Sequence, residues 1–317
     1  MNSLEYELMV SDNSKAPSPF KATSLVWENL CSVFRNRFDS EGVADIEDQS
    51  YNASFASYPR NDRRYERFAR GLGITIPVQG WYESACQAYF DLLSLENFQL
   101  WKLVPLNKTS AKSSMAHTLR DGTKVTWDYL LTMETLITIL RVKPQLCDQP
   151  LNIVDLGAGW GRLGASLLAM NPRLTYVIAD IPESLIISQE YLPRHLEDTP
   201  FIPFSETRTY TSIERESLSE RPGVWICGTQ SLPRFTDKSI DLFLNVFSFQ
   251  EMTLVQNEEY FRVIDRITKG GLFYNAQRVV SDVMTQRNYP YRKNWIGRGE
   301  MHMAFSSSYF HSLHEIR

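Results

Sequence analysis

An acidic residue followed by three closely spaced glycines is the strongest chemical signal in the sequence. Asp155 stands near the end of a short apolar run at 151–156, and Gly157, Gly159 and Gly161 follow it. Glycines at such spacing let the backbone turn sharply and approach a ligand closely, with amide N–H groups exposed toward it. The spacing therefore predicts a ligand-binding loop at the end of a strand, with a carboxylate beside it.

Two classes of cofactor are compatible with this loop. Residues 159–164 fit the G-x-G-x-x-G pattern of dinucleotide-binding loops. Asp155 argues against that interpretation, because a pyrophosphate beside it would meet a like charge, whereas a sulfonium cofactor with a free amino group would be attracted. A second acid, Asp180, ends the next apolar run at 174–180. Dinucleotide enzymes also place an acid near this spacing, so Asp180 does not discriminate between the two classes.

With its acid followed by G-x-G-x-G, this region resembles the S-adenosylmethionine (SAM)-dependent methyltransferases. The resemblance implies that SAM is the cofactor and that the carboxylate of Asp180 accepts hydrogen bonds from both ribose hydroxyls. It also implies adenine contact through Thr229 or Gln230, and a position for Asn245 beside the methionine arm. The expected cofactor-binding residues are Asp155, Gly157, Ala158, Gly159, Gly161, Asp180, Ile181, Thr229, Gln230 and Asn245.

Within the methyltransferases, the sequence is most similar to the sugar O-methyltransferases. The similarity lies in segments 126–136, 179–185, 189–192 and 248–253. It implies methylation of a sugar hydroxyl, in a glycan or a glycosylated metabolite. Three alternatives stay open: a small-molecule N-, C- or O-methyltransferase of secondary metabolism, an NAD-dependent oxidoreductase, and a non-catalytic subunit that binds SAM.

Methyl transfer to a hydroxyl requires alignment within about 3–3.5 Å and a group that removes the hydroxyl proton. Two residues are candidates for this base: Glu251, just after the fourth predicted strand, and His302 in the C-terminal segment. His311 and His314 are three residues apart but lack a convincing third ligand, so no metal site is predicted. Dependence on a divalent metal stays open.

Aromatic residues are dense in the segments expected around the acceptor, where flat rings could stack on a sugar or surround a sulfonium. The alternative is that most of them belong to the core. Segment 287–298 also carries several cations, which would suit a phosphorylated, nucleotide-linked or acidic sugar, or simply a solvated loop. The aromatic residues in question are Trp127, Tyr129, Phe247, Phe249, Tyr289, Tyr291 and Trp295.

Strand-like and helical patterns alternate after residue 150, which predicts an α/β fold with a doubly wound, mostly parallel sheet. The expected strands are 151–156, 174–180, 224–229, 239–248 and 272–278. One expected helix follows the glycine loop and ends at residue 170, and two others cover 183–196 and 253–268. An inserted segment is expected between the second and third of these strands. The short remainder after residue 278 predicts a short helix and a hairpin, with compact or incomplete final strands.

The N-terminal part has a different character. Residues 1–126 are predicted to form a helical region on the substrate side, and residues 127–317 the SAM-binding domain. Helices are expected at 24–34, 83–101 and 128–141. The first twenty residues are polar and predict a frayed tail or arm. The polar stretch 39–64 predicts a loop, and the loop at 105–126 is long enough to act as a mobile lid.

The overall composition excludes several classes of protein. The chain has 317 residues with 33 basic and 37 acidic side chains, a net charge of −4, which argues against binding to nucleic acid. It contains no apolar run long enough to span a membrane and no visible secretory signal. The four cysteines lack a Cys-x-x-Cys spacing and predict reduced thiols in a cytoplasmic protein. The expected partner is a small molecule or glycan, and homo-oligomerisation is left open.

Overall fold

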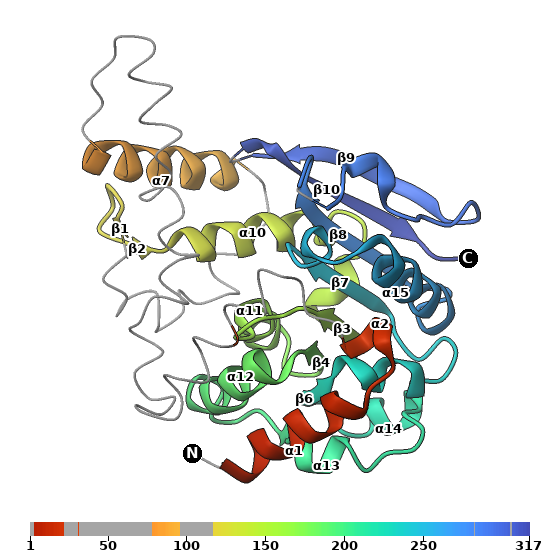
Figure 1. The fold of residues 1–317 in the computed structure, drawn as a ribbon. Helices are drawn as coiled ribbons and strands as arrows, with labels where there is room; N and C mark the ends of the chain where they lie inside the picture. Colours follow the sequence, from red (N-terminus) through yellow and green to blue (C-terminus); the bar gives the residue numbers. More distant parts are fainter. Residues whose placement is uncertain (1–2, 22–30, 32–77, 96–116, 282, 305) are drawn as a thin grey trace. The chain divides into compact units, whose positions relative to one another are not determined.

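The computed structural model describes residues 3–21, 31, 78–95, 117–281, 283–304 and 306–317 (Figure 1). The chain divides into two compact units. The first unit contains Met1–Gly42 together with Ile139–Arg317, and the second contains Val43–Thr138. The predicted domain boundary between residues 126 and 127 stays a prediction.

An eight-stranded sheet forms the centre of the first unit, with strand order β5-β6-β4-β3-β7-β8-β10-β9 (Figure 1). The first six strands in this order are parallel to one another, and β10 pairs antiparallel with both β8 and β9. The predicted doubly wound, mostly parallel α/β fold is confirmed. The strands are β3 (Asn152–Leu156), β4 (Thr175–Asp180), β5 (Phe201–Ile202), β6 (Gly223–Gly228), β7 (Leu242–Val246), β8 (Leu272–Arg278), β9 (Ile296–Met303) and β10 (Ser306–Glu315).

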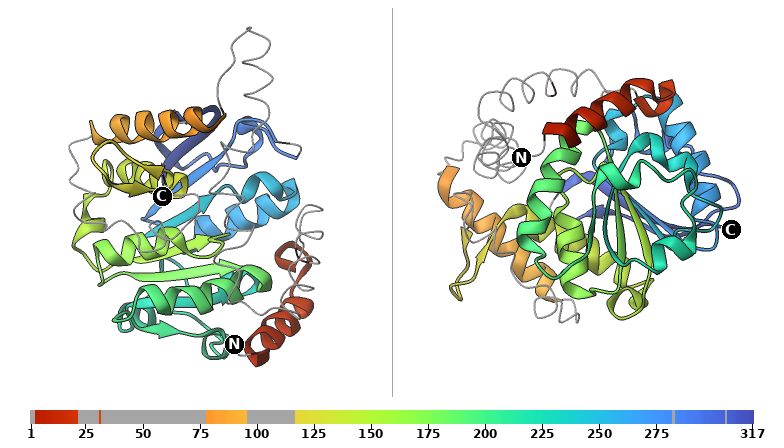
Figure 2. Two further views of the ribbon diagram at one scale, coloured as in Figure 1. Left: turned by 90° about the vertical axis from the view of Figure 1, so that its left-hand side faces the viewer. Right: turned by 90° about the horizontal axis from the view of Figure 1, so that it is seen from below.

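The parallel strands form because short apolar runs are covered on both faces by helices, as Figure 2 shows. Every residue of β3, β4 and β6 is buried. After β3 the chain proceeds to β4 and β6 on one side, then returns to place β7 on the other side of β3. The strand order thus reverses between β3 and β7, and ligands of open α/β sheets bind at the carboxyl ends of strands beside such a reversal.

The predicted helices of this unit are confirmed within a few residues. Helix α15 has an N-terminal capping box in which Thr253 and Gln256 bond each other's backbone N–H. Its apolar face carries Phe261, which packs edge-on against Phe273 of β8 with ring centroids 5.4 Å apart. The helices are α11 (Arg162–Met170), α12 (Pro182–His195), α13 (Phe204–Thr207), α14 (Arg215–Ser219) and α15 (Leu254–Ile267). Four 3₁₀ turns accompany them: η1 (Pro144–Cys147), η2 (Thr229–Arg234), η3 (Phe249–Glu251) and η4 (Gln286–Asn288).

Two further predictions concern the segment between β4 and β6 and the chain after β8. The expected insertion between β4 and β6 contains α12, β5, α13 and α14, so it adds an edge strand to the sheet. The predicted hairpin is confirmed as the antiparallel pair β9 and β10. The expectations of a short helix before it and of compact strands were wrong, because the described residues between β8 and β9 form the 3₁₀ turn η4 and both strands are long. The pair is long because β10 has partners along both of its edges.

Of the two alternatives predicted for the N-terminal residues, a frayed tail or an arm, the structure shows an arm that packs on the α/β unit. Ser3–Lys15 form helix α1 and Ser18–Lys21 form the short helix α2. We refer to residues 3–21 as the N-terminal strap. Its helix α1 packs against α12 and α13, and α2 packs against η2 and α15. These tertiary contacts stabilise a helix whose own sequence has little apolar periodicity.

The second unit is described over a smaller part of its length. It contains α7 (Val78–Ser94), the two-residue strands β1 (His117–Thr118) and β2 (Lys124–Val125), and most of α10 (Trp127–Leu140). The hydroxyl of Tyr89 donates to the carboxylate of Glu134, which joins α7 to α10. The predicted helix at 24–34, the loop at 39–64 and most of the 105–126 loop lie outside the described residues. No helix in the described ranges has both the length and the apolar character that a membrane crossing requires.

Candidate functional site

The glycine loop lies at the carboxyl end of β3 and is tied to the end of β4. Gly157 N–H donates to the carbonyl of Ala179 at 2.9 Å, and Gly159 N–H donates to Asp180 Oδ2 at 2.8 Å. Asp180 Oδ1 accepts from the N–H of Ile181 at 2.7 Å. The carboxylate of Asp180 therefore fixes the position of the loop.

The three glycines of the loop have positive φ angles but different surroundings. A Cβ at Gly157 would lie 2.3 Å from Ser248 Oγ, and one at Gly161 would lie 2.7 Å from Leu192 Cδ1. A Cβ at Gly159, where φ is 60°, would have no atom of the described residues within 4 Å. The loop is thus packed tightly at both ends, and its middle faces open space, which leaves room for a ligand above Gly159.

Asp155 is buried, and one of its two carboxylate oxygens is unsatisfied. Its Oδ2 accepts a hydrogen bond from the hydroxyl of Tyr176 on β4. Its Oδ1 is buried without a hydrogen-bond partner in the described part of the chain. A buried carboxylate oxygen in this position attracts a cationic ligand. Nothing in the spacing of the sequence pointed to Tyr176, which reaches Asp155 only because β3 and β4 are neighbours.

Burial shifts the ionisation of both acids. It raises the pKa of Asp155 to about 7, against the opposing effect of the Tyr176 hydrogen bond. It also raises the pKa of Asp180 to about 7, against the hydrogen bonds from Ile181 and Gly159 N–H. Each acid would ionise more readily beside a positive charge or hydroxyl donors.

Two further predicted residues follow the end of β6, where Gly228 lies opposite Asp180 in the sheet register. The Thr229 hydroxyl donates to the carbonyl of Phe20 in the N-terminal strap at 2.7 Å. The amide of Gln230 covers Gly228, because a Cβ added there would lie 2.3 Å from Gln230 Oε1. The predicted nucleoside-binding residues are therefore brought together. Sequence reasoning missed Phe20, which is far from them along the chain.

Asn245 lies beside the loop, and its side chain is engaged within the protein. Its Nδ2 donates to the carbonyl of Leu156 at 2.8 Å and to Ser248 Oγ at 2.5 Å. Its Oδ1 accepts from the N–H of Phe249 at 3.0 Å and from Gln277 Nε2 at 2.6 Å. Asn245 thus links the end of β7 to the end of β3, from which the glycine loop continues.

The polar contacts of Asn245 continue across the sheet through Gln277 of β8. Gln277 Nε2 donates to Asn245 Oδ1 and, at 2.8 Å, to Asn275 Oδ1, while its Oε1 accepts from the N–H of Gln250 at 3.1 Å. Asn275 Nδ2 in turn donates to the hydroxyl of Tyr291 at 2.7 Å. Asn245, Asn275 and Gln277 are all fully buried, so each depends on the others for its hydrogen bonds.

Replacing Gln277 by leucine is expected to lower the free energy of unfolding by about 2–4 kcal/mol, because it leaves several buried polar groups without partners. Urea denaturation measures this change. The matched control is Gln286→Leu, because Gln286 bonds Glu300 at the surface, and a surface change is expected to stay within about 0.5 kcal/mol. Equal midpoints for the Gln277→Leu variant and the wild type would contradict this role of the network.

The two predicted bases lie in different places. Glu251 ends η3, directly after β7, and its N–H donates to the carbonyl of Ser248 at 3.1 Å. His302 is an exposed residue of β9, paired with Phe310 of β10. The strand order puts β9 three strands from β7, about 14 Å at ordinary strand spacing. Of the two, Glu251 is therefore nearer the glycine loop, because it follows β7, the neighbour of β3.

Most of the aromatic residues considered as acceptor contacts belong to the core, as the alternative prediction stated. Phe249, Tyr289 and Trp295 are buried, and Tyr291 packs against the same hydrophobic cluster. Trp295 Nε1 donates to Asp265 Oδ1 on α15 at 2.6 Å. Tyr129 is buried in the second unit, and the side chain of Trp127 lies outside the described residues.

Phe247 is the exception among these aromatic residues. It follows the carboxyl end of β7 with a φ of 64°, a conformation rare for a residue with a side chain. Its ring packs edge-on against Tyr309 with centroids 5.2 Å apart, and it is only partly buried. Phe247 therefore lies at the same edge of the sheet as the glycine loop.

Over the residues that the structure describes, no group of three or more His, Cys, Asp or Glu side chains is arranged to hold a metal ion.

Comparisons with known proteins were made at three levels. No protein-family model matches the sequence, and no curated protein matches it. Among solved structures, the chain is similar to the PH0226 protein of Pyrococcus horikoshii OT3 (13% identity, TM-score 0.40, 60% of this chain and 90% of that chain covered). It is also similar to magnesium protoporphyrin IX methyltransferase from Synechocystis PCC 6803 with bound SAM (11%, 0.40, 59% and 81%). A third is a SAM-dependent methyltransferase from Aquifex aeolicus (13%, 0.35, 56% and 88%). Because these similarities are distant, the fold is assigned from the strand order of the eight-stranded sheet.

Proposed function

We propose that the protein is a SAM-dependent methyltransferase. The observation that carries the proposal is the buried, unsatisfied Oδ1 of Asp155 beside a glycine loop whose middle faces open space. A ligand with positive charge would satisfy this oxygen, whereas the pyrophosphate of a dinucleotide would meet two buried acids, Asp155 and Asp180. The residues present therefore fit SAM, which carries a sulfonium and an ammonium group.

Each part of the loop has a defined role in this proposal. SAM, when bound, supplies a methyl group that its sulfonium already activates. Asp155 favours the positive charge of the ligand, and Asp180 accepts hydrogen bonds from hydroxyl groups of the nucleoside. Asn245 holds the ends of β3 and β7 together, so that the loop keeps its shape whether or not a ligand is bound. A loop fixed in advance loses less entropy on binding.

The acceptor in this proposal is a sugar hydroxyl, and Glu251 removes its proton. The support is the similarity of segment 248–253 to the sugar O-methyltransferases, together with the position of Glu251 at the end of η3. His302 is the less favoured base because it lies on the outer strand β9. A base positioned next to the acceptor contributes about 10²–10⁴-fold to the rate, so Glu251→Gln should reduce turnover by that factor with little effect on SAM binding.

Calorimetric titration of the purified protein with SAM, S-adenosylhomocysteine and NAD tests the cofactor. Saturable binding of the first two, without binding of NAD, is the expected result. Binding of NAD alone would overturn the proposal. Transfer of labelled methyl groups to a panel of sugars then tests the acceptor. Labelling of non-sugar compounds only would leave a methyltransferase of a different substrate class, and SAM binding without any transfer would indicate a non-catalytic subunit.

A further inference from the structure

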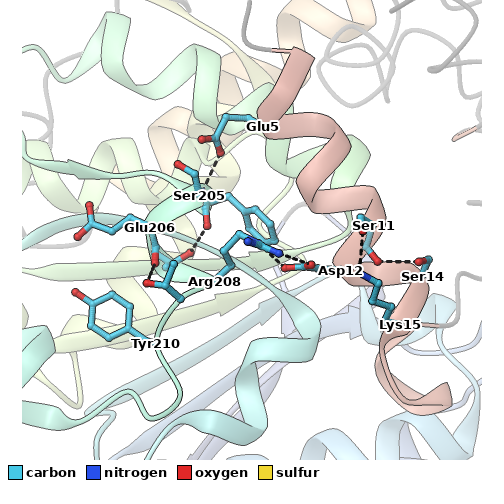
Figure 3. Close-up of polar contacts among 12 residues, drawn as sticks. Glu5, Ser11, Asp12, Ser14, Lys15, Ser205, Glu206, Arg208 and Tyr210 are labelled. Atoms are coloured by element: carbon cyan, nitrogen blue, oxygen red, sulfur yellow. Dashed lines mark hydrogen bonds and ion pairs between the residues drawn. The ribbon is translucent and has the colours of Figure 1, made fainter.

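The N-terminal strap contacts residues that follow the carboxyl ends of three neighbouring strands. The hydroxyl of Tyr6 donates to Oε1 of Glu183, three residues after β4, at 3.3 Å. The Phe20 carbonyl accepts from Thr229, the residue after β6. A third contact joins the strap to the segment after β5, where Ser205 N–H donates to Glu5 Oε2 at 3.0 Å (Figure 3). Because β4, β5 and β6 are parallel, their carboxyl ends share one edge, and the strap crosses that edge.

The end of the strap lies beside the residues expected to bind the nucleoside. Phe20 is 5% exposed, and its ring packs edge-on against Tyr260 of α15 with centroids 5.4 Å apart. Burial raises the pKa of Tyr260, and the negative charge of Asp180 raises it further, while a hydrogen bond with Thr229 lowers it. Phe20, Thr229 and Tyr260 therefore meet at the same end of the sheet as Asp180.

The strap contacts Thr229 directly, and it contacts Glu183, three residues beyond Asp180. Asp180 is 8% exposed and Thr229 is 4% exposed. A ligand as large as a nucleoside cannot contact both side chains unless an element that covers them moves. Opening of the strap would expose Met9 and Phe20, which are 1% and 5% exposed, so the closed state is favoured and opening is infrequent. Leu4 and Val10 of α1 are already exposed, at 58% and 36%.

One ion pair fastens the middle of the strap. The guanidinium of Arg208, just after α13, makes two hydrogen bonds to the carboxylate of Asp12, at 2.7 and 2.8 Å (Figure 3). Such paired bonds fix geometry as well as adding energy. The side chains are 32% and 17% exposed, so water weakens the pair without abolishing it. A pair of this kind stabilises a closed conformation and still permits opening.

We infer that the N-terminal strap is a gate over the nucleoside half of the SAM site, opening to admit the cofactor and release its product, with Phe20 forming part of the closed wall. This inference rests on the proposed function. It identifies the Asp12–Arg208 pair as the fastening of the gate and adds Phe20 to the cofactor site. Opening of the gate then limits how fast S-adenosylhomocysteine leaves.

Stopped-flow measurement of S-adenosylhomocysteine dissociation from the full-length protein tests the gate. Asp12→Asn and Arg208→Gln should each accelerate dissociation about fivefold, which corresponds to losing a partly exposed ion pair. The double variant Asp12→Arg/Arg208→Asp restores opposite charges and should recover most of the slow dissociation. The matched control is Arg215→Gln, because Arg215 makes a similar paired contact with Asp241 at the amino end of β7, and it should not change the rate.

The outcomes separate the gate from the proposed function. If wild type binds S-adenosylhomocysteine and the Asp12 and Arg208 variants release it at the wild-type rate, the gate is overturned and the cofactor assignment stands. If the wild-type protein binds neither SAM nor S-adenosylhomocysteine, the gate and the proposed function are both overturned. Hydrogen exchange provides an independent test, in which backbone amides of residues 3–21 should exchange more slowly with ligand bound. Unchanged exchange in that segment would also overturn the gate.

Discussion

Lowering the pH from about 8 to about 6 is expected to weaken SAM binding by about tenfold for each of Asp155 and Asp180 that must ionise in the complex. Both acids have a pKa raised to about 7 in the free protein, chiefly by burial. A cationic ligand and hydroxyl donors favour their ionised forms, so binding below pH 7 must first remove their protons. Titration calorimetry across this range measures the effect, and two ionising acids would give about a hundredfold change.

The stability of the free protein should change with pH in the opposite direction. Each acid has a folded pKa above its ordinary value of 3.8, so the folded state holds more protons than the unfolded state between about pH 4 and about pH 7. The free energy of unfolding therefore falls as the pH rises through this window, by about 1.4 kcal/mol per pH unit for each acid. Weaker binding at low pH thus cannot be attributed to unfolding. A binding constant that is flat from pH 8 to pH 6 would contradict the assignment of these two acids.

Replacing Gly159 by alanine is expected to reduce SAM affinity by at least about a hundredfold while leaving the protein folded. The new methyl group would occupy the open space above the loop, where no atom of the residues that the structure describes lies within 4 Å. A φ of 60° is also unfavourable for alanine, which costs about 1 kcal/mol or somewhat more. Calorimetry gives the affinity, and thermal unfolding shows that the fold is retained.

Gly270 provides a control with the same backbone requirement. Its φ is 91°, and a Cβ there also meets no atom within 4 Å, but it lies between α15 and β8 at the amino end of the sheet. Gly270→Ala should therefore lower stability by a similar or larger amount without affecting SAM binding. Equal affinities for the Gly159→Ala and Gly270→Ala variants would mean that the loop does not contact the cofactor.

The regular α/β part of the chain could be predicted because its signals are local. Each strand from β3 to β8, apart from the two-residue β5, is a short apolar run, and the glycines after Asp155 mark the turn that follows the first of them. Since parallel strands must be covered on both faces, these runs specify the layers and place Asp155 and Asp180 at one edge. Thr229 and Gln230 were expected from the resemblance to the SAM-dependent methyltransferases, and they follow the end of β6.

The remaining features depend on contacts between residues far apart in the sequence. Asn245 was expected beside the methionine arm from the resemblance to the methyltransferases, but its hydrogen bonds go to Leu156 and Gln277, which only the folded sheet brings to it. Tyr176 reaches Asp155 across two strands for the same reason. His302 looked equivalent to Glu251 until the strand order placed it on the outer strand. The spacing of two residues along the sequence does not show how many strands separate them in the sheet.

The strap also has a consequence for how the chain folds during synthesis. Its hydrogen bonds to Ser205 and Thr229 join residues 200 and 209 positions apart. The strap therefore leaves the ribosome long before its partners exist, and it can dock only after β6 and α15 have been made. A strongly apolar segment would be prone to aggregation during that delay. The polar sequence of α1 keeps the segment soluble until then, and the same polarity makes it resemble an unstructured tail.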